Sequence, residues 1–386
     1  MPFYAMPSFS PNNISSHFLP QNAVDTASHV PKIAPEHDAP LGSWSEDDIR
    51  KATANSTMLT WMPGKIKHGL PIITHGEGVY VYDKSGKQYL DWTSQAVCSN
   101  VGYDLPPAVK AAVVQQMETL PFAYGGLGIP EIRARLSSLL TDLMPGDLQG
   151  MVFPSSGSEA NEAAIMIARR YTGKHKVINW YRSYHGGTAN SLQATGDSRR
   201  WLGKDMLPGF VKAHNPWPFF FDYAGETETE RTNMALAMLE EQILNEGPDT
   251  VAMMSFESIV GSGGVLIPPD GFMQGVRALC DKYHIVMHCD EVMTGFGRTG
   301  KLFGFQNFDG VLPDIISCAK GITSSAIPMS MTAVRKPIMD HFEETSIGWG
   351  STYQVSAVNA MYAYCFFFFI LIPYTPSHTN SQFYFI

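Results

Sequence analysis

From about residue 106 onward, short apolar runs alternate with segments whose apolar residues recur every three to four positions. Runs such as 176–181, 250–257 and 285–291 are typical of strands that are buried on both faces. The segment 158–173 has the spacing of an amphipathic helix and ends in glycine, a common residue just past a helix. This alternation predicts an α/β fold whose mostly parallel sheet is covered by helices on both faces.

Residues typical of helix starts and turns predict further elements. Segments 106–120 and 130–144 have helical spacing with proline near each start, and 270–284 is the helix expected between two of the strands. Upstream, residues 78–92 alternate apolar and polar positions around the turn at Asp83–Gly86, which predicts a β-hairpin.

Composition divides the chain into four parts. Residues 1–45 are rich in Pro, Ser, Asn and His and are expected to form a mobile arm. Residues 46–105 are assigned to the first segment of a smaller α+β domain, and 106–345 to the large domain. No Asp, Glu, Lys or Arg follows Glu344, so we expect 346–386 to be an aberrant, truncated C-terminal segment that leaves the small domain incomplete.

The overall composition narrows the class of protein. The formal net charge is −9, which does not favour a nucleic-acid partner. No run of 18 apolar residues occurs, so no membrane span is predicted. The five cysteines form no CxxC pair, which indicates free thiols in a reducing compartment. Cytoplasm and mitochondrion both remain open, because residues 1–45 carry no clear targeting signal.

Candidate chemistry gathers where strands end, since ligands of open α/β sheets bind at the carboxyl ends of the strands. Lys320 follows the apolar run 315–319, and lysine is rarely buried without a partner. A desolvated amine loses basicity and becomes a nucleophile toward carbonyl groups. The alternative, a surface lysine whose stem lies along apolar residues, fits the preceding strand poorly.

The turn 154–162 is a second candidate, because it joins a strand to a helix. Ser156, Gly157 and Ser158 offer hydroxyl groups, a close backbone approach and a helix N-terminus, which together suit a phosphate. An ordinary serine-capped helix with Glu162 in its first turn is the competing interpretation, and such caps are common.

Two more groups could contact a planar ligand. Asp290 ends a strand, where its carboxylate could hold a proton on a ring nitrogen; a structural Asp that caps a loop is the alternative. Tyr184 and His185 precede two glycines and could lay an aromatic ring flat against a ligand. A core aromatic beside a turn is equally compatible with the pattern. Glu257 ends a third strand.

Two other motifs are set aside. Gly295, Gly297 and Gly300 match G-x-G-x-x-G, but no helix is expected after them, so a dinucleotide site is not predicted. A zinc site built from His284, His288 and Cys289 is disfavoured, because neighbouring residues of a strand point to opposite faces. We therefore predict no metal site.

Taken together, the candidates offer a phosphate cradle, an aromatic ring, a carboxylate for a ring nitrogen and an amine for an aldehyde. Pyridoxal 5′-phosphate is the cofactor whose groups require all four.

The motifs "SSGSEANE", "YHGG", "DEVMTGFGRTG" and "DIISCAKG" stand in an order that resembles the class III aminotransferases, which are fold-type I pyridoxal-phosphate enzymes. The similarity runs from about Leu59 to Tyr353 and is closest in character to members that use pyruvate, such as taurine–pyruvate aminotransferases. It implies transfer of an amino group from an ω-amino acid or amine donor to an α-keto acid, through a Schiff base on Lys320. The substrates would be small molecules.

The resemblance also implies roles for individual residues. Lys320 would carry the cofactor, Asp290 would keep its ring protonated, and Tyr184 would stack on the ring. Gly157 and Ser158 would bind the phosphate, Val292 would pack behind the ring, and Glu257 would lie on the cofactor or substrate side. The segment "GSTYQ" would bring Thr352 to the phosphate of a partner subunit, which implies a homodimer with shared active sites, and Trp61 would line the substrate pocket.

The chain departs from the family at two places. Ser258 stands where the family usually has proline, and no arginine follows Arg335, although the family often binds the substrate carboxylate with a later one. Two alternatives therefore stay open. The cofactor could serve an aminomutase, epimerase or decarboxylase, or the chain could be a non-catalytic subunit that binds cofactor or a full-length partner.

Overall fold

The computed structural model describes residues 39–203, 207–217 and 222–371. The chain forms two compact units, residues 1–74 and 75–386. Residues 1–38 of the expected N-terminal arm and 372–386 of the expected C-terminal segment lie outside the described residues. The domain boundaries expected from the sequence stay predictions.

The first unit is built on helix α1 (Glu46–Ser56), which a capping box begins. Ser45 accepts from the backbone N–H of Asp48, whose carboxylate accepts from the backbone N–H of Ser45. Lys67, in the short helix η3 (Gly64–Gly69), closes the other end of α1. Its Nζ donates to the last carbonyls, those of Thr53, Ala54 and Thr57.

The second unit begins with the predicted hairpin. Strands β2 (Tyr80–Asp83) and β3 (Gln88–Leu90) pair antiparallel, and β1 (Ile73–Glu77) is the third strand of this sheet. Asp83 Oδ1 accepts from the backbone N–H groups of Ser85 and Lys87, which fixes the turn. The hairpin prediction is therefore confirmed.

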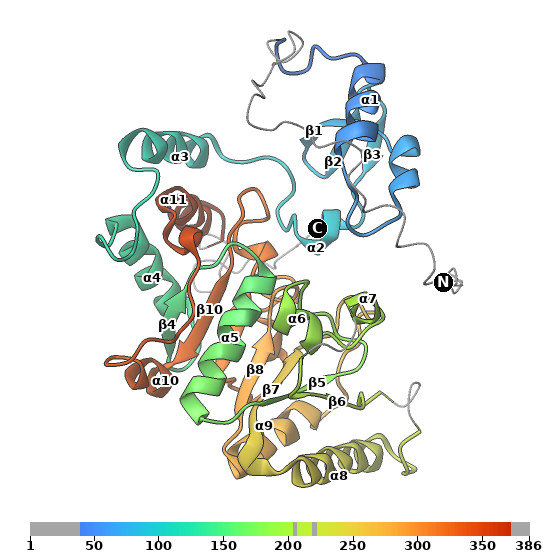
Figure 1. Cartoon of the computed structure of the whole chain (residues 1–386), viewed down its shortest axis with the longest axis vertical. Coiled ribbons are helices and arrows are strands. Elements are labelled where there is room, and N and C mark those ends of the chain that lie inside the picture. Colours follow the sequence, from blue (N-terminus) through green and yellow to red (C-terminus); the bar gives the residue numbers. More distant parts are fainter. Residues whose placement is uncertain (1–38, 204–206, 218–221, 372–386) are drawn as a thin grey trace, which may run out of the picture. The chain divides into compact units, whose positions relative to one another are not determined.

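A seven-stranded sheet of order β4-β10-β9-β8-β7-β5-β6 forms the centre of the unit (Figure 1). The five strands from β9 to β6 run parallel, while β10 pairs antiparallel with both β9 and β4. The predicted mostly parallel sheet is thus confirmed. The strands are β4 (Leu148–Val152), β5 (Lys176–Trp180), β6 (Phe210–Ala213), β7 (Val251–Glu257), β8 (Val286–Asp290), β9 (Ile315–Cys318) and β10 (Met331–Arg335).

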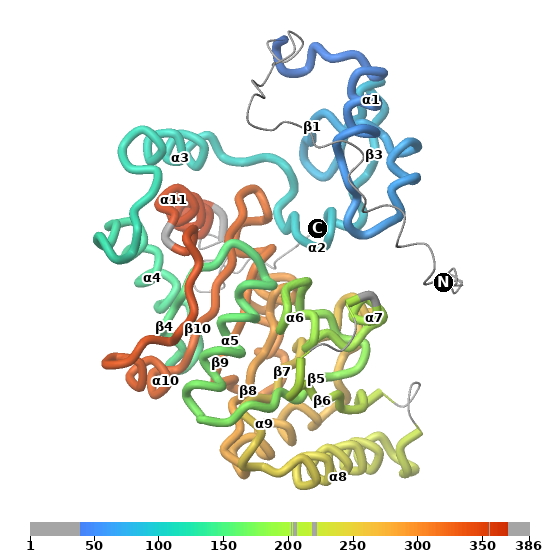
Figure 2. The backbone as a smooth tube through the Cα atoms, viewed as in Figure 1, coloured from blue at the N-terminus to red at the C-terminus, as the bar shows by residue number. Residues whose placement is uncertain are grey.

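Strands β4 and β10 are far apart in the sequence but lie side by side at one edge of the sheet (Figure 2). The register pairs Thr332 with Val152 and Val334 with Gly150. Gly150 suits this crowded position, because an added Cβ would lie 2.9 Å from Val334 Cγ2 and from Met339 Cβ. The last strand of this sheet in the sequence, β10, therefore lies beside the first, β4.

Helices cover both faces of the sheet, as the alternating pattern predicts. Helix α5 (Gly157–Thr172) buries Ala164 and Ile167 with Val177 and Met253 on one face. The other face packs Ile178 and Met254 against a set of helices. This set comprises α4 (Glu131–Leu143), α8 (Glu228–Glu246), α9 (Phe272–Tyr283) and α11 (Ala357–Phe366). Each large apolar side chain buried in this way contributes about 1.5–3 kcal/mol.

The described part of the C-terminal segment also belongs to the core. Helix α11 packs against α3 (Pro107–Thr119), where Tyr362 and Phe366 cluster with Val109. Phe367 begins the short π-helix η8 (Phe367–Leu371) and is buried beside Phe296. Among the described residues, no helix is both long and apolar enough to cross a lipid bilayer.

Shorter elements connect these parts. They are α2 (Ser94–Val97), α6 (Ala189–Ala194), α7 (Arg200–Gly203), η4 (Pro248–Thr250), η5 (Gly304–Asn307), η6 (Lys320–Ile322), α10 (Lys336–His341) and η7 (Thr352–Val355).

Candidate active site

The predicted site residues meet at the carboxyl ends of three adjacent parallel strands. Glu257 is the last residue of β7 and pairs in register with Asp290, the last residue of β8. Asp290 pairs in turn with Ser317 of β9, and Lys320 stands two residues beyond the end of that strand. The strand ends thus bring together three groups that lie about 30 residues apart along the chain.

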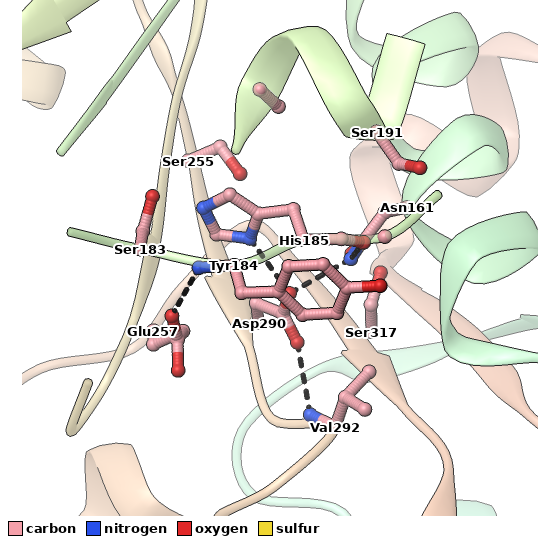
Figure 3. A network of polar contacts seen from close by, with 12 residues as sticks. Asn161, Ser183, Tyr184, His185, Ser191, Ser255, Glu257, Asp290, Val292 and Ser317 are labelled. Atoms are coloured by element: carbon pink, nitrogen blue, oxygen red, sulfur yellow. Dashed lines mark hydrogen bonds and ion pairs between the residues drawn. The ribbon is translucent and has the colours of Figure 1, made fainter. Parts of the chain in front are cut away.

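Asp290 is the centre of a buried polar network (Figure 3). Its Oδ2 accepts from Asn161 Nδ2 at 2.8 Å and lies 2.7 Å from His185 Nδ1, while its Oδ1 accepts from Val292 N at 3.0 Å. Burial raises the pKa of this carboxyl, but the hydrogen bond and charge of His185 outweigh burial, so the pKa lies below its usual value. Asp290 is therefore ionised at neutral pH.

Asn161 is a site residue that the sequence analysis did not single out. It lies in α5, four residues after Gly157, and therefore on the same face of the helix. Its Nδ2 also donates to the His185 carbonyl at 2.7 Å, so one side chain fixes both members of the Asp290–His185 pair. The signal available in the sequence was a polar residue on the buried face of an otherwise apolar helix.

Lys320 combines partial burial with an unusual backbone. Its φ is +44°, in the left-handed region that non-glycine residues seldom adopt and that is often found at functional sites. Burial lowers the pKa of its amine, while the charges of Asp290 and Glu257 oppose that shift. This direction agrees with the loss of basicity that the sequence predicts, and the role of Lys320 stays a prediction. No hydrogen bond or ion pair engages Nζ within the described part of the chain.

Glu257 is buried beside the same network. Its Oε1 accepts from the backbone N–H of Tyr184 and its Oε2 from that of Gly261, both at 2.9 Å. Burial raises its pKa to about 7, with Asp290 adding to the shift and His185 opposing it. At neutral pH both the protonated and the ionised forms of Glu257 are therefore populated.

This pKa predicts a pH-dependent stability. The folded chain holds a proton on Glu257 up to about pH 7, whereas the unfolded chain releases it near pH 4.5, the ordinary pKa of a glutamate carboxyl. Glu257 therefore makes its full contribution to the free energy of unfolding below about pH 4.5. This contribution, about 3 kcal/mol, is lost as the pH rises through about 7. In Glu257→Gln this part of the pH dependence should disappear.

Urea unfolding at about pH 5 and about pH 7.5 measures the difference. Glu344→Gln, which changes an exposed carboxylate, serves as the matched control. If the natural chain and Glu257→Gln lose the same stability between the two conditions, Glu257 does not carry a raised pKa.

Helix α5 begins at Gly157, which packs against residues next to Asp290 and Lys320. A Cβ on Gly157 would lie 2.9 Å from both Cγ atoms of Val292 and 3.5 Å from Ala319 Cβ, so these residues are packed together. Ser156 caps the helix by accepting from Glu159 N at 3.3 Å, as the competing interpretation expected. Ser158 Oγ accepts from Gly187 N at 3.1 Å. The first N–H groups of any helix lack intrahelical partners and suit an anion.

Tyr184 lies in front of Asp290 in the network (Figure 3). The Arg199 guanidinium carbon stands 3.6 Å from the centre of the Tyr184 ring. Asp197 and Ser262 hold the guanidinium, the latter by a hydrogen bond of 2.8 Å from Arg199 Nη2. A cation thus covers one face of the aromatic ring. Burial raises the pKa of the Tyr184 hydroxyl.

The other two predicted site residues are both exposed. Trp61 belongs to the first unit and is largely exposed, and its role at a substrate pocket stays a prediction. Thr352 begins the exposed turn η7, and its role toward a partner subunit likewise stays a prediction.

The motifs set aside in the sequence have structural roles. After Gly295, Gly297 and Gly300 the chain forms only the short helix η5, so the helix that a dinucleotide fingerprint requires does not follow. His288 lies fully buried between the hydroxyls of Ser255 and Ser317, at 2.8 and 2.9 Å. Burial lowers its pKa to about 3, so it is neutral.

Comparison with known proteins agrees with this geometry. The family model "Aminotransferase class-III" matches residues 63–366, and the chain therefore belongs to the class III aminotransferase family. The resemblance inferred from the motifs is confirmed.

Individual relatives are similar over most of this chain. It is 37% identical over 279 residues to the uncharacterized aminotransferase YhxA of Bacillus subtilis strain 168, covering 70% of this chain and 60% of that one. It is 36% identical over 282 residues to a putrescine–pyruvate aminotransferase of Pseudomonas aeruginosa, covering 70% and 61%.

A solved structure agrees with the fold. That of taurine:2-oxoglutarate aminotransferase from Bifidobacterium kashiwanohense superposes with a TM-score of 0.77 at 39% identity, covering 84% of this chain and 73% of the other. The predicted α/β fold is thereby confirmed. The chain spans about 60% of the length of the curated relatives it matches.

Proposed function

We propose that this protein is a pyridoxal-phosphate-dependent aminotransferase that moves an amino group from an amine or ω-amino acid to an α-keto acid such as pyruvate. The observation that carries the proposal is the meeting of an ionised carboxylate, Asp290, with an unpaired amine, Lys320, at adjacent strand ends beside a helix N-terminus. Family membership supports the same activity.

The residues present fit the cofactor. A carboxylate has about four acceptor positions, and protein donors use three of those on Asp290, which leaves one on Oδ1 for a ring N–H. Gly157 and Ser158 at the start of α5 would hold a phosphate, and Val292 and Tyr184 would contact the ring. The B. kashiwanohense structure contains the cofactor and glutamate, which supports the assignment.

When bound, pyridoxal phosphate supplies an electron sink for the bond that breaks at the donor carbon. Lys320 would hold the cofactor covalently and, once displaced, would move a proton at the donor carbon, since burial lowers the pKa of its amine and so increases the share of the uncharged, proton-accepting form. Asp290 would keep the ring nitrogen protonated. Glu257, with a pKa of about 7, lies close enough to influence the charges of Asp290 and Lys320.

The test supplies the purified chain with cofactor, putrescine or taurine, and pyruvate, and measures alanine. We expect alanine to form with at least one amine donor and to require both donor and cofactor. Consumption of the donor without alanine would indicate an aminomutase, epimerase or decarboxylase instead. Cofactor binding without any turnover would indicate a non-catalytic subunit, and either result contradicts the proposal.

We also propose a homodimer with shared sites. Apolar side chains between residues 114 and 129 are unusually exposed, with Leu127 at 86% and Ile129 at 78%. A monomer seldom leaves so many apolar groups in water, so a second copy of the chain is the proposed cover. Thr352 would then reach the phosphate of the partner subunit. Light scattering should give twice the mass of one chain, and a monomer would contradict the proposal.

A further inference from the structure

Glu291 is a fully buried carboxylate whose acceptor positions are all filled. Its Oε1 accepts from Ser258 Oγ and from Phe305 N at 2.9 Å. Its Oε2 accepts from Thr294 Oγ1 and from Gly304 N, both at 2.6 Å. Because a carboxylate offers about four such positions, this set leaves no room for another donor. The side chain is therefore a structural anchor rather than a group that touches substrate.

The partners of Glu291 come from separate segments around the candidate site. Ser258 follows directly after β7, and Glu291 follows directly after β8. The backbone N–H of Glu291 also donates to the Ser317 carbonyl of β9 at 2.7 Å. Hydrogen bonds of one residue thus join the ends of the three strands that carry Glu257, Asp290 and Lys320.

The loop that Glu291 holds also packs against the turn that contains Lys320. A Cβ added to Gly321 would lie 3.0 Å from the Gly295 carbonyl oxygen and 3.2 Å from Phe296 Cβ. Glycine is therefore required for this close approach. A displacement of the loop 291–305 would therefore also shift Gly321, the residue after Lys320.

The hydroxyl of Ser258 matters because the anchor is buried. Burial raises the pKa of Glu291, and the hydrogen bond from Ser258 is the largest opposing influence. Without the Ser258 hydroxyl, Oε1 would keep only the Phe305 N–H as a donor, and the burial of the carboxyl would be less well compensated.

We propose that Ser258 and Glu291 form a positioning pair that holds the loop 291–305 and, through it, the Lys320 turn in the geometry that the cofactor requires. The pair acts on the site without touching the reacting atoms. The proposal rests on the proposed function, since it names residues that support the same cofactor site.

The first test needs no cofactor. Hydrogen exchange of the Gly304 and Phe305 amides and of the segment 320–322 is compared between the natural chain and Ser258→Ala. We expect about tenfold faster exchange in the variant, because a hydrogen bond to a buried charge is lost. Ser330→Ala is the matched control, since Ser330 is equally buried and its hydroxyl has no partner among the described residues.

The second test measures the dissociation constant of pyridoxal phosphate and the pH at which the absorbance of the bound cofactor changes. Ser258→Ala should weaken binding about three- to tenfold and shift that pH, while Ser330→Ala should change neither. In the Glu291→Gln background, Ser258→Ala should have a smaller effect than in the natural chain, because the two residues act together.

The outcomes separate the two proposals. Unchanged exchange in Ser258→Ala, or additive effects in the double variant, would overturn the pair even if the chain binds cofactor normally. A natural chain that fails to bind cofactor would instead contradict the proposed function, and the exchange measurement would still decide the pair. If Ser258→Ala does not fold, Ser258→Cys keeps the volume with a weaker donor, and a smaller change in the same direction supports the pair while no change overturns it.

Discussion

Lys320→Ala is expected to reduce amino transfer by about 10² to 10⁴-fold, the range that a proton-transferring catalytic group contributes. The amine is partly buried, its pKa is lowered by burial, and the carboxylates of Asp290 and Glu257 act on it. An alanine can neither attach the cofactor nor move a proton. Alanine formation from an amine and pyruvate gives the rate, and mass spectrometry after borohydride treatment reports whether cofactor is fixed to the chain.

Lys301→Ala is the matched control, because Lys301 is exposed and outside the site. It should retain the natural rate and the borohydride-fixed cofactor on the peptide that contains Lys320. A Lys320→Ala protein that borohydride still converts to a covalent cofactor adduct would show that another amine holds the cofactor, and the assignment of the site would be wrong.

Asp290→Asn is expected to reduce amino transfer by about 10² to 10³-fold, comparable to the removal of one preorganised electrostatic contact. The amide is neutral and cannot keep a ring nitrogen protonated. Asn161, His185 and Val292 all contact the Asp290 carboxylate. The NH₂ group of an asparagine at this position would therefore face another hydrogen-bond donor. Cofactor affinity should therefore fall together with the rate.

Alanine formation and the dissociation constant of pyridoxal phosphate are the two measurements. Asp309→Asn changes an exposed carboxylate and should leave both unaltered. Because the aspartate network is buried, the unfolding midpoint of Asp290→Asn is recorded as well. A variant with near-natural rate and affinity would contradict the assigned role of Asp290, whatever its stability.

Much of the site could be predicted from strand ends alone. Lys320, Asp290 and Glu257 each follow an apolar run, and parallel strands bring their carboxyl ends to one edge of the sheet. The sequence was sufficient to locate these strand ends because each apolar run is short and ends at a polar residue. The hairpin at 80–90 was predictable for the same reason, since the turn at Asp83–Gly86 carries a local signal.

Other features depended on contacts between distant segments. Nothing in the local pattern placed β10 between β9 and β4, because the pairing of β10 with β4 is antiparallel and joins segments about 180 residues apart. The cap on Ser156 was likewise undecided, since the same residues suit a phosphate and an ordinary helix start.

The sequence by itself determined the alternation of strands and helices in the large domain and the identities of the amine and carboxylate, because hydrophobic periodicity and the positions of charged residues are local properties. Only the tertiary structure decided which groups support them. Asn161 and His185 meet at Asp290, and Ser258 meets Glu291, through hydrogen bonds that join residues 24 to 129 positions apart. Such partnerships arise from the packing of whole elements, and no local pattern encodes them.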